Sequence, residues 1–429
     1  MHVSHGKKSQ AIIRRDHKLM SPSYDRHSGF VYKRAKGCYL WDLDGHRFLD
    51  FAAGIAVMNA GHSNPEVVAA IKKQLKFGLH AAFPDFYAEL PVRFSERLVS
   101  FLPRELNKVF LSNSGTESVE AAFKLARWHS KKKWAVAFTP SFHGRTMGSL
   151  SMTNSNPVAR ARFEPFLPVK HVPYPYIYRF KNEDEGECAN HSLNAIERVF
   201  KKHNGNVASI FFEPICGEGG YIVPPKDFAR GVRRLCDEYG VIFCVDEVQS
   251  GCFRAGKFLA ISNFGVVPDI VSLSKAIGGG VPLGATIAKK EIMDWGEGVH
   301  SNTFGGNLLA CAAGVATLDF LKKKRLGQNA VKVGNMMLKV LNEMKEEIEI
   351  IGDVRGIGLM IGVEVVKSKK SKEIDEKLLE NVLLDAGDKG LLLLHAGKNV
   401  IRICPPLVLS EKQAMVGLEI LGSSLKKFG

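Results

Sequence analysis

The sequence predicts an α/β protein with a large, mostly parallel sheet domain and a smaller α+β domain from both termini. Three observations predict this fold class. Short β-rich runs alternate with amphipathic helical segments through the middle of the chain, these runs lack clean polar alternation, and the pattern changes towards the C-terminus. The 429 residues also exceed the size at which one hydrophobic core usually stops growing, so two domains are expected.

The strand candidates of the middle region are short apolar runs, rich in β-branched and aromatic residues. Such runs are typical of strands that are covered on both faces. The helical segments between them favour parallel neighbours joined by right-handed crossovers. Because ligands bind beyond the carboxyl ends of such strands, we expect functional residues directly after each run. The predicted strands are 108–111, 134–138, 208–212, 241–245, 270–273 and 284–288.

The two ends of the chain together predict the smaller domain. Segment 38–51 reads as a hairpin with its turn at Asp44-Gly45, and we expect it to pair with the C-terminal part. The predicted C-terminal elements are a helix at 329–348, a strand at 358–366, a second helix, strands at 391–394 and 400–403, and a final helix. The expected boundaries are 60–325 for the large domain, with 1–59 and 326–429 forming the small one.

Composition excludes several classes of protein. An apolar fraction of 45% with 24% charged residues is typical of a compact globular chain. No apolar stretch approaches the roughly 20 residues that span a bilayer, and the polar, basic N-terminus does not resemble a signal peptide. We therefore predict a cytoplasmic protein without a membrane partner.

The charge and the metal-binding residue types also argue against two classes of ligand. The net charge of +15 comes with lysine clusters that lack interleaved aromatic residues or a nucleic-acid motif. Solvated helix faces explain them better, so no nucleic-acid partner is expected. The 14 histidines and eight cysteines show no metal-site spacing and no C-x-x-C pair. We predict no metal, and cysteines that are small buried thiols.

The segment 112–117, Ser-Asn-Ser-Gly-Thr-Glu, follows a predicted strand and opens a helix. Ser114 and Glu117 have the spacing of a capping box. Gly115 lets an anion approach the backbone, and the hydroxyls of Ser114 and Thr116 can donate to it. A helix N-terminus of this kind suits a phosphate, although the segment alone also fits an ordinary capped helix.

Two charged residues follow neighbouring apolar runs. Asp246 comes at the end of one run, where a buried carboxylate needs a cationic partner, and a protonated pyridine nitrogen is one candidate. Lys275 follows the next run and precedes three glycines. A half-buried lysine has a lowered pKa and can act as a nucleophile towards an aldehyde and then as a base. Each residue alone also fits a structural or solvated role.

Motifs across nearly the whole chain, from about Gly37 to Pro406, resemble those of class III aminotransferases, which are fold type I pyridoxal-phosphate enzymes. They occur in the family's order: Phe142-His-Gly-Arg145, Glu213-Pro-Ile-Cys-Gly-Glu218, Asp246-Glu-Val-Gln249, Ser274-Lys275 and Thr303-Phe-Gly-Gly-Asn307. Segments 54–62 and 171–175 are similar to those of archaeal-type 4-aminobutyrate aminotransferases. Some archaeal relatives of this shape are amino-acid racemases.

The resemblance implies a role for each site residue. Lys275 would carry the Schiff base, and Asp246 would pair with the pyridine nitrogen. The other implied cofactor-binding residues are Ser114, Gly115 and Thr116 at the phosphate, Phe142, His143 and Val248 around the ring, Gln249 near its phenolic oxygen, and Thr303 from a partner subunit. The implied substrate-binding residues are Ile55, Arg145, Glu213, Glu218 and Arg402, with Glu218 as a gate that pairs with Arg402.

The resemblance therefore predicts a homodimer or a dimer of dimers that uses pyridoxal phosphate. The expected reaction is ping-pong transfer of an amino group from an ω-amino acid such as 4-aminobutyrate to 2-oxoglutarate. An amino-acid racemase and an acetylornithine- or ornithine-type aminotransferase stay open. Two departures from the family pattern, Phe253 in place of glycine and Leu308 in place of proline, bear on substrate detail only.

Overall fold

The computed structural model describes residues 6–26 and 28–429. Residues 1–5, the start of the polar N-terminal segment, lie outside the described part. The chain divides into two compact units, residues 1–64 with 328–429, and residues 65–327. No helix in the described part of the chain is both long and apolar enough to cross a membrane.

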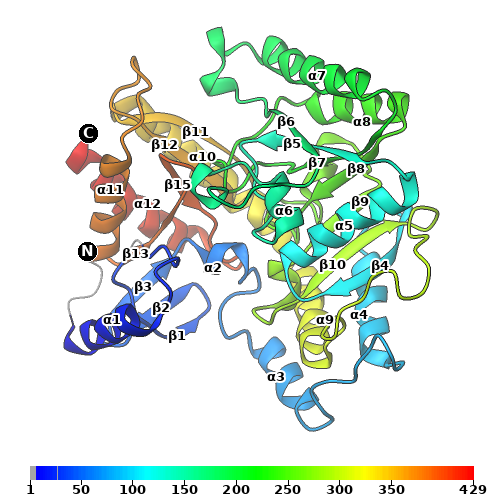
Figure 1. Ribbon diagram of the computed structural model, residues 1–429. Coiled ribbons are helices and arrows are strands. Elements are labelled where there is room, and N and C mark those ends of the chain that lie inside the picture. Colours follow the sequence, from blue (N-terminus) through cyan, green and yellow to red (C-terminus); the bar gives the residue numbers. More distant parts are fainter. Residues whose placement is uncertain (1–5, 27) are drawn as a thin grey trace. The chain divides into compact units, whose positions relative to one another are not determined.

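The larger unit contains a seven-stranded sheet (Figure 1). Its strand order is β4-β10-β9-β8-β7-β5-β6, and only the two pairings of β10 are antiparallel. The predicted mostly parallel sheet is therefore confirmed. The strands are β4 (Leu106–Ser112), β5 (Trp134–Thr139), β6 (Val169–Pro173), β7 (Val207–Phe212), β8 (Ile242–Asp246), β9 (Ile270–Leu273) and β10 (Gly284–Lys289).

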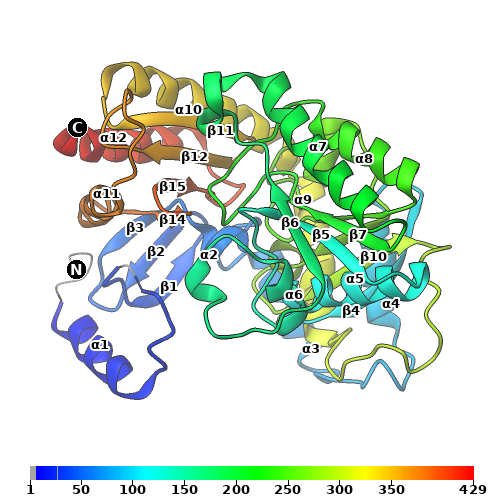
Figure 2. The ribbon, with the colours of Figure 1, turned by 45° about the horizontal axis from the view of Figure 1, so that its top comes forward.

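Helices cover this sheet because its central strands are apolar throughout. Every residue of β7, β8 and β9 is buried, as expected for strands packed on both faces. Helix α5 contacts five of the strands, while α7 and α8 lie side by side (Figure 2). The helices are α3 (Pro65–Gln74), α4 (Glu89–Val99), α5 (Gly115–Ser130), α6 (Met147–Met152), α7 (Glu185–Lys202), α8 (Phe228–Tyr239) and α9 (Leu308–Lys323).

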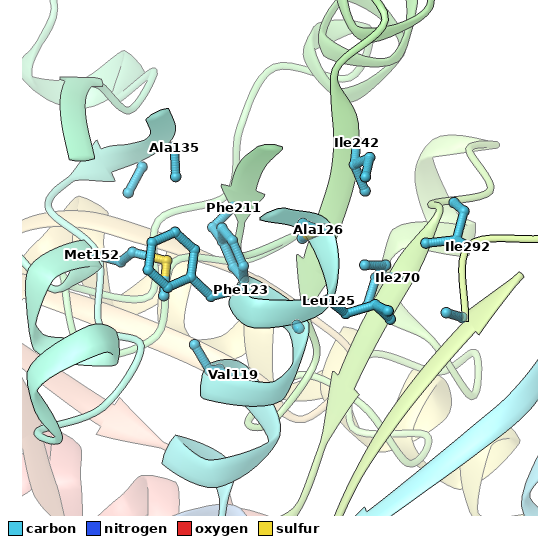
Figure 3. Close-up of a cluster of buried hydrophobic side chains, with 14 residues drawn as sticks. Val119, Phe123, Leu125, Ala126, Ala135, Met152, Phe211, Ile242, Ile270 and Ile292 are labelled. Carbon is cyan, nitrogen blue, oxygen red and sulfur yellow. The ribbon is translucent and has the colours of Figure 1, made fainter. Parts of the chain in front are cut away.

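The core beneath α5 follows the periodicity of the sequence. Val119, Ala122, Phe123 and Ala126 recur along one face of the helix, and all four are buried. Figure 3 shows this face against side chains of several strands, with Phe123 close to Phe211. This packing fixes the helix against the sheet, so that its N-terminus has a defined place at the strand ends.

The smaller unit contains two four-stranded sheets, ordered β1-β2-β3-β13 and β11-β12-β15-β14. The hairpin predicted at Asp44-Gly45 is confirmed, and its second strand pairs with the C-terminal β13. The strands are β1 (Tyr32–Lys36), β2 (Tyr39–Asp42), β3 (Arg47–Asp50), β11 (Ile351–Ile357), β12 (Met360–Val365), β13 (Leu391–Leu392), β14 (Leu394–Ala396) and β15 (Val400–Ile403). The helices are α1 (Lys7–Leu19), α2 (Ala53–Ala56), α10 (Leu326–Glu347), α11 (Glu376–Asp388) and α12 (Glu411–Phe428).

Two strand predictions in this unit are wrong in detail. The single strand expected at 358–366 is the second half of a hairpin, β11–β12, which turns at Gly358 where φ is +60°. The strand expected at 391–394 is split, because β13 pairs with β3 whereas β14 pairs with β15 in the other sheet. The helix predicted to start at residue 329 begins at Leu326. All eight cysteines are buried and free, as the sequence predicts.

Candidate active site

Most predicted site residues lie in loops at one edge of the seven-stranded sheet. β4 and β9 are both antiparallel to β10, so the carboxyl ends of β4, β5, β7, β8 and β9 meet at the same edge. The loops after these strands carry Ser114, Gly115, Thr116, Phe142, His143, Arg145, Glu213, Glu218, Asp246, Val248, Gln249 and Lys275. The candidate residues from these five loops are therefore brought to one edge of the sheet.

The segment predicted to bind a phosphate lies at the N-terminus of α5. Ser114 is the N-cap, and its hydroxyl accepts a hydrogen bond from Glu117 N at 3.2 Å. The second bond of a capping box would join the Glu117 carboxylate to Ser114 N. Here the carboxylate instead accepts from Asn113 N at 2.7 Å. A Cβ on Gly115 would lie 2.7 Å from Val248 Cγ1, so only glycine fits here. The first turn of the helix therefore offers backbone N–H groups, and the hydroxyl of Thr116 lies beside them.

Lys275 is separated from β9 by Ser274 alone and opens a short 3-10 turn, Lys275–Gly278. Its φ of +46° lies in the left-handed region, which is uncommon for a side chain of this size. If Gly115 carried a Cβ atom, it would lie 3.6 Å from Ser274 Cβ. The segment that carries Lys275 is therefore next to the N-terminus of α5. Strained backbone of this kind is frequent at functional sites.

Asp246 ends β8 and is joined to His143 from the loop after β5. His143 Nδ1 lies 2.8 Å from Asp246 Oδ2, and Asp246 Oδ1 accepts from Val248 N at 3.0 Å. Burial opposes the charged form of His143, but the hydrogen bond and the charge of Asp246 outweigh it and raise its pKa. His143 Nε2 is buried and has no hydrogen-bond partner among the described residues.

Glu213 connects the loops after β5 and β7. Its two carboxylate oxygens accept from Phe142 N and Gly217 N, each at 3.0 Å. Burial raises the pKa of Glu213 to about 7. These bonds hold the backbone of Phe142, whose ring lies 5.7 Å from the exposed guanidinium of Arg145.

Gln249 and Glu218 lie in the loops after β8 and β7. Gln249 Oε1 accepts a hydrogen bond from the hydroxyl of Tyr221 at 2.8 Å, and a Cβ on Gly217 would lie 2.7 Å from Gln249 Nε2. Glu218 is partly exposed within a loop closed by an antiparallel bridge between Cys216 and Ile222.

Two residues that the sequence analysis did not single out support this site. Tyr221 is buried and fixes the amide of Gln249. Thr153 Oγ1 accepts from His143 N at 2.9 Å and from Gly144 N at 3.2 Å. Both act through hydrogen bonds between distant segments, so motif spacing carries no signal for them.

The remaining predicted residues lie apart from these loops in the chain. Thr303 is exposed, and the neighbouring Asn302 donates to Leu111 O at 2.9 Å, at the end of β4. Ile55 and Arg402 belong to the smaller unit. Ile55 is half-exposed, whereas Arg402 is buried on β15.

The two departures from the family pattern have a local explanation. Phe253 has a φ of +67°, where glycine is usual, and its ring packs edge-on against Phe101 and Phe258. Leu308 occupies the first position of α9 after the cap Asn307, whose side chain accepts from Ala310 N. Proline is favoured at that position but is not required there.

The groups at the strand ends fit pyridoxal phosphate. A helix N-terminus with flanking hydroxyls suits the phosphate, and the close approach of Val248 to Gly115 is consistent with a tightly packed pocket. The buried Asp246 suits a protonated ring nitrogen, and Lys275 supplies an amine for the aldehyde. In the described part of the chain, no cluster of three or more His, Cys, Asp and Glu side chains could hold a metal ion.

Comparison with known proteins shows the family to which this chain belongs. The aminotransferase class-III family profile matches residues 20–425. A leucine/methionine racemase of Thermococcus litoralis is 36% identical and covers 97% of this chain and 95% of its own. A probable 4-aminobutyrate aminotransferase of Bacillus subtilis is 36% identical, with 92% of each chain covered. An acetylornithine aminotransferase of Methanopyrus kandleri is 40% identical and covers 92% and 94%.

Two solved structures have the same fold over nearly the whole chain. One is an amine transaminase from an uncultivated Pseudomonas species in its pyridoxal-phosphate-bound form, with a TM-score of 0.90, 30% identity and coverage of 96% and 98%. The other is a taurine:2-oxoglutarate aminotransferase from Bifidobacterium kashiwanohense, with a TM-score of 0.92, 28% identity and coverage of 98% for each chain.

The fold and the strand-end site together define a pyridoxal-phosphate-dependent enzyme of fold type I. The chain belongs to the class III aminotransferase family. The family resemblance and the cofactor predicted from the sequence are thereby confirmed.

Proposed function

We propose that this enzyme transfers an amino group from an ω-amino acid, such as 4-aminobutyrate, to 2-oxoglutarate by a ping-pong mechanism. The observation that carries the proposal is the exposed guanidinium of Arg145 above the ring of Phe142. It places a permanent cation next to the cofactor-binding loops, where it can bind the carboxylate at the far end of a substrate. The 4-aminobutyrate aminotransferase named among the relatives supports this substrate class.

Pyridoxal phosphate, when bound, supplies an electron sink that stabilises negative charge next to the reacting carbon. Lys275 would hold the cofactor through Nζ and then move the substrate proton with the same atom. Asp246 would keep the pyridine nitrogen protonated, since its carboxylate is buried and is oriented by His143 and by Val248 N. These roles need a lysine and a carboxylate at neighbouring strand ends, which is where the two residues lie.

The other loop residues would orient the cofactor. Ser114, Gly115 and Thr116 would bind its phosphate at the N-terminus of α5. Phe142 and Val248 would cover the two faces of its ring. Gln249, held by Tyr221, would donate to its phenolic oxygen.

The substrate-binding roles rest on the resemblance. Arg145 would bind the carboxylate of an ω-amino acid, and Arg402 would bind the α-carboxylate of glutamate or 2-oxoglutarate. Glu218 would pair with Arg402 when that second carboxylate is missing. Glu213 and Ile55 would line the pocket, although both Glu213 oxygens already accept backbone hydrogen bonds, which favours a supporting role.

The proposed assembly is a homodimer, alone or paired into a dimer of dimers. An exposed apolar surface around the Thr303 segment supports it: Phe77, Phe86 and Phe304 are 74%, 67% and 58% exposed. His80 packs against Phe304 with ring centroids 5.1 Å apart, so this surface joins two segments distant in sequence. A second copy of the chain would bury these rings and bring Thr303 to the other site. The cytoplasmic location stays a prediction from composition.

A second candidate is amino-acid racemisation. One observation favours it. The racemase from Thermococcus litoralis and the probable 4-aminobutyrate aminotransferase from Bacillus subtilis are each 36% identical to this chain. Racemisation needs the same lysine and the same electron sink, so the strand-end site serves either reaction. The acetylornithine relative keeps a third donor class open.

The deciding experiment incubates the pure enzyme with single amino acids, with and without 2-oxoglutarate. Both the nitrogen transferred and the enantiomeric composition of the amino acid are measured. An aminotransferase forms glutamate from 4-aminobutyrate only when 2-oxoglutarate is present. Loss of optical activity without an acceptor, together with no transfer from any ω-amino acid, would overturn the proposal in favour of racemisation.

A further inference from the structure

Three hydroxyl groups form a cluster where helix α6 packs against α5 in the larger unit (Figure 1). Thr116 Oγ1, in the first turn of α5, lies 2.6 Å from Ser149 Oγ and 2.8 Å from Thr146 Oγ1. Ser149 Oγ and Thr146 Oγ1 lie 3.0 Å apart. A Cβ on Gly144 would collide with both Thr116 Oγ1 and Ser149 Oγ. The hydroxyl cluster is therefore closely packed, and each of its members is within hydrogen-bond distance of the other two.

Glu120, one turn further along α5 than Thr116, limits which hydrogen bonds the cluster can form. Its Oε1 accepts from Thr146 Oγ1 at 2.5 Å and from Ser149 N at 3.0 Å. A hydroxyl group has a single hydrogen, and the carboxylate takes that of Thr146. Thr146 Oγ1 can therefore only accept hydrogen bonds from its two neighbours in the cluster.

Ser149 is then the hydroxyl that can donate to Thr116 Oγ1. It is buried, and its shortest hydroxyl contact is the one to Thr116. Its alternative backbone acceptor, Thr146 O at 3.1 Å, already accepts from Leu150 N at 2.6 Å. When Ser149 donates to Thr116 Oγ1, the hydrogen of Thr116 is left for a further acceptor. That acceptor is either Thr146 Oγ1 or an anion at the N-terminus of α5.

An anion at the N-terminus of α5 would meet Gly115 N and Thr116 N. The first N–H groups of a helix have no acceptor within the helix. Ser114 accepts from the next two, through its hydroxyl from Glu117 N and through its carbonyl from Ser118 N. Two backbone donors and the hydroxyl of Thr116 together suit a phosphate. A bound phosphate and the neighbouring acceptor in the hydroxyl cluster would therefore compete for the same hydrogen.

We propose that Ser149 is a positioning residue that orients the Thr116 hydroxyl as a donor to the cofactor's phosphate, whereas Thr146 competes with the phosphate for that hydrogen. The two residues therefore change the affinity for the cofactor in opposite directions. The inference rests on the proposed function, in which Thr116 binds the phosphate. It concerns how firmly the phosphate is held and assigns neither residue a part in moving the amino group.

The test measures the Kd values of pyridoxal phosphate and of pyridoxal, which lacks the phosphate, by spectral titration of the full chain. Ser149→Ala should raise the Kd of pyridoxal phosphate about tenfold, as expected for a weakened hydrogen bond to a charged group, and leave that of pyridoxal unchanged. Thr146→Val should lower the Kd of pyridoxal phosphate about threefold, because it removes a neutral competing acceptor. Ser151→Ala is the matched control and should change neither value. Ser151 is also buried on α6, but its hydroxyl bonds to Met147 O and Leu167 N.

A double variant separates positioning from general stability. If Ser149 acts through Thr116, the Kd of pyridoxal phosphate for Ser149→Ala with Thr116→Val should equal that for Thr116→Val alone. Additive losses in the double variant, or equal losses for both ligands in Ser149→Ala, would overturn the inference. If Ser149→Ala does not fold, Thr146→Val decides, since Thr146 is exposed. A Kd of pyridoxal phosphate that this variant does not lower would then overturn the inference.

The outcome also separates this inference from the proposed function. If Thr116→Val raises the Kd of pyridoxal phosphate and Ser149→Ala does not, only the inference is overturned. If Thr116→Val leaves that Kd unchanged, Thr116 does not bind the phosphate, and its proposed role and the inference are both wrong. The amino-transfer reaction is tested separately, by the incubations with single amino acids.

Discussion

His143 Nδ1 and Asp246 Oδ2 lie 2.8 Å apart, and both side chains are buried at the strand-end edge of the sheet. The charge of Asp246 raises the pKa of His143 against the effect of burial. The histidine in turn fixes one carboxylate oxygen, and Val248 N fixes the other. Asp246 is thereby oriented from two sides by groups of the protein itself, which is the preorganisation that an electrostatic role requires.

The first prediction concerns this carboxylate. Asp246→Asn should retain the fold and bind the cofactor, but it should slow proton abstraction by about 10²–10⁴-fold. A neutral amide does not keep the ring nitrogen protonated, and it lacks the charge that raises the pKa of His143. Single-turnover absorbance measurements give the rate directly.

The control for this variant is Asp269→Asn. Asp269 precedes β9 at the other end of the strands, where it bonds to Arg233 and Lys289. Its loss should lower the melting temperature with little effect on turnover. If Asp246→Asn turns over at the wild-type rate, its role is only structural.

The second prediction concerns Lys275. The purified protein should be yellow, and borohydride reduction should fix the cofactor to Lys275, where peptide mass mapping detects it. Lys275→Ala should lose at least about 10²-fold in rate, because the same amine holds the cofactor and moves the proton. Lys257→Ala, at an exposed lysine bonded to Ser262 O, is the matched control. Cofactor found on a different lysine would refute the assignment.

Strand-end residues could be predicted because each follows a buried apolar run. Asp246 and Lys275 end such runs, and the fold fixes which edge they share. β6 was not predicted, because it lies at the edge of the sheet and only Val172 of its five residues is buried. Its sequence therefore lacks the continuous apolar signal of the central strands.

Features that depend on contacts between distant segments could not be predicted. β11 was missed since most of its residues are only partly buried, and Arg355 on it pairs with Glu364 of β12. The left-handed backbone within α2, with a φ of +64° at Ile55, has no sequence signal, because isoleucine normally avoids that conformation and the start of the segment is held by bonds from Ala52 N and Ala53 N to Asp50. Sequence spacing identifies the chemical groups, whereas the supporting groups are visible only in the folded chain.

The third prediction concerns assembly. The active species should be a dimer, and Lys275→Ala and Thr303→Ala subunits should each be impaired as homodimers. If Thr303 serves the partner's site, a heterodimer of the two variants has one site with both defects and one site with neither. Mixing the two variants should therefore restore activity. Sedimentation and activity of the mixture test this. An active, stable monomer would contradict it, as would a mixture no more active than its components.

The fourth prediction concerns Glu247, a buried carboxyl outside the proposed chemistry. It accepts hydrogen bonds from Ser250 Oγ at 2.6 Å and Ile261 N at 2.8 Å. Burial raises its pKa from the usual 4.5 to about 7. Between these values the unfolded chain ionises while the folded chain keeps its proton, so stability falls as pH rises from 4.5 to 7.

Glu247→Gln should remove this part of the pH dependence, which amounts to about 3 kcal/mol. Denaturant unfolding of both proteins across that pH range measures the difference. The pKa of Glu213 is raised in the same way, so both carboxyl groups contribute to the pH dependence of the wild-type unfolding free energy. The difference between the wild type and Glu247→Gln gives the contribution of Glu247. Parallel curves for the variant and the wild type would show that Glu247 is ionised in the folded state.

The last prediction concerns dual substrate recognition by Glu218, Arg145 and Arg402. Glutamate has two carboxylates and offers one to each arginine, whereas 4-aminobutyrate has only one. That carboxylate should bind Arg145, so that the amine of 4-aminobutyrate reaches the cofactor. The family resemblance implies that Glu218 pairs with Arg402 in that half-reaction, and losing one member of a buried ion pair costs on the order of 3–5 kcal/mol. If Glu218 pairs with Arg402 in this way, its charge matters only for the ω-amino donor.

Glu218→Gln should therefore lower kcat/KM for 4-aminobutyrate more than for glutamate, whereas Arg402→Ala should damage glutamate most. Each half-reaction is measured separately, by following the cofactor spectrum in single turnovers. Glu187→Gln, at an exposed glutamate in the first turn of α7, controls for the loss of one negative charge. Equal losses for both donors in Glu218→Gln would refute the gate, because a carboxylate that pairs with Arg402 in only one half-reaction cannot affect both alike.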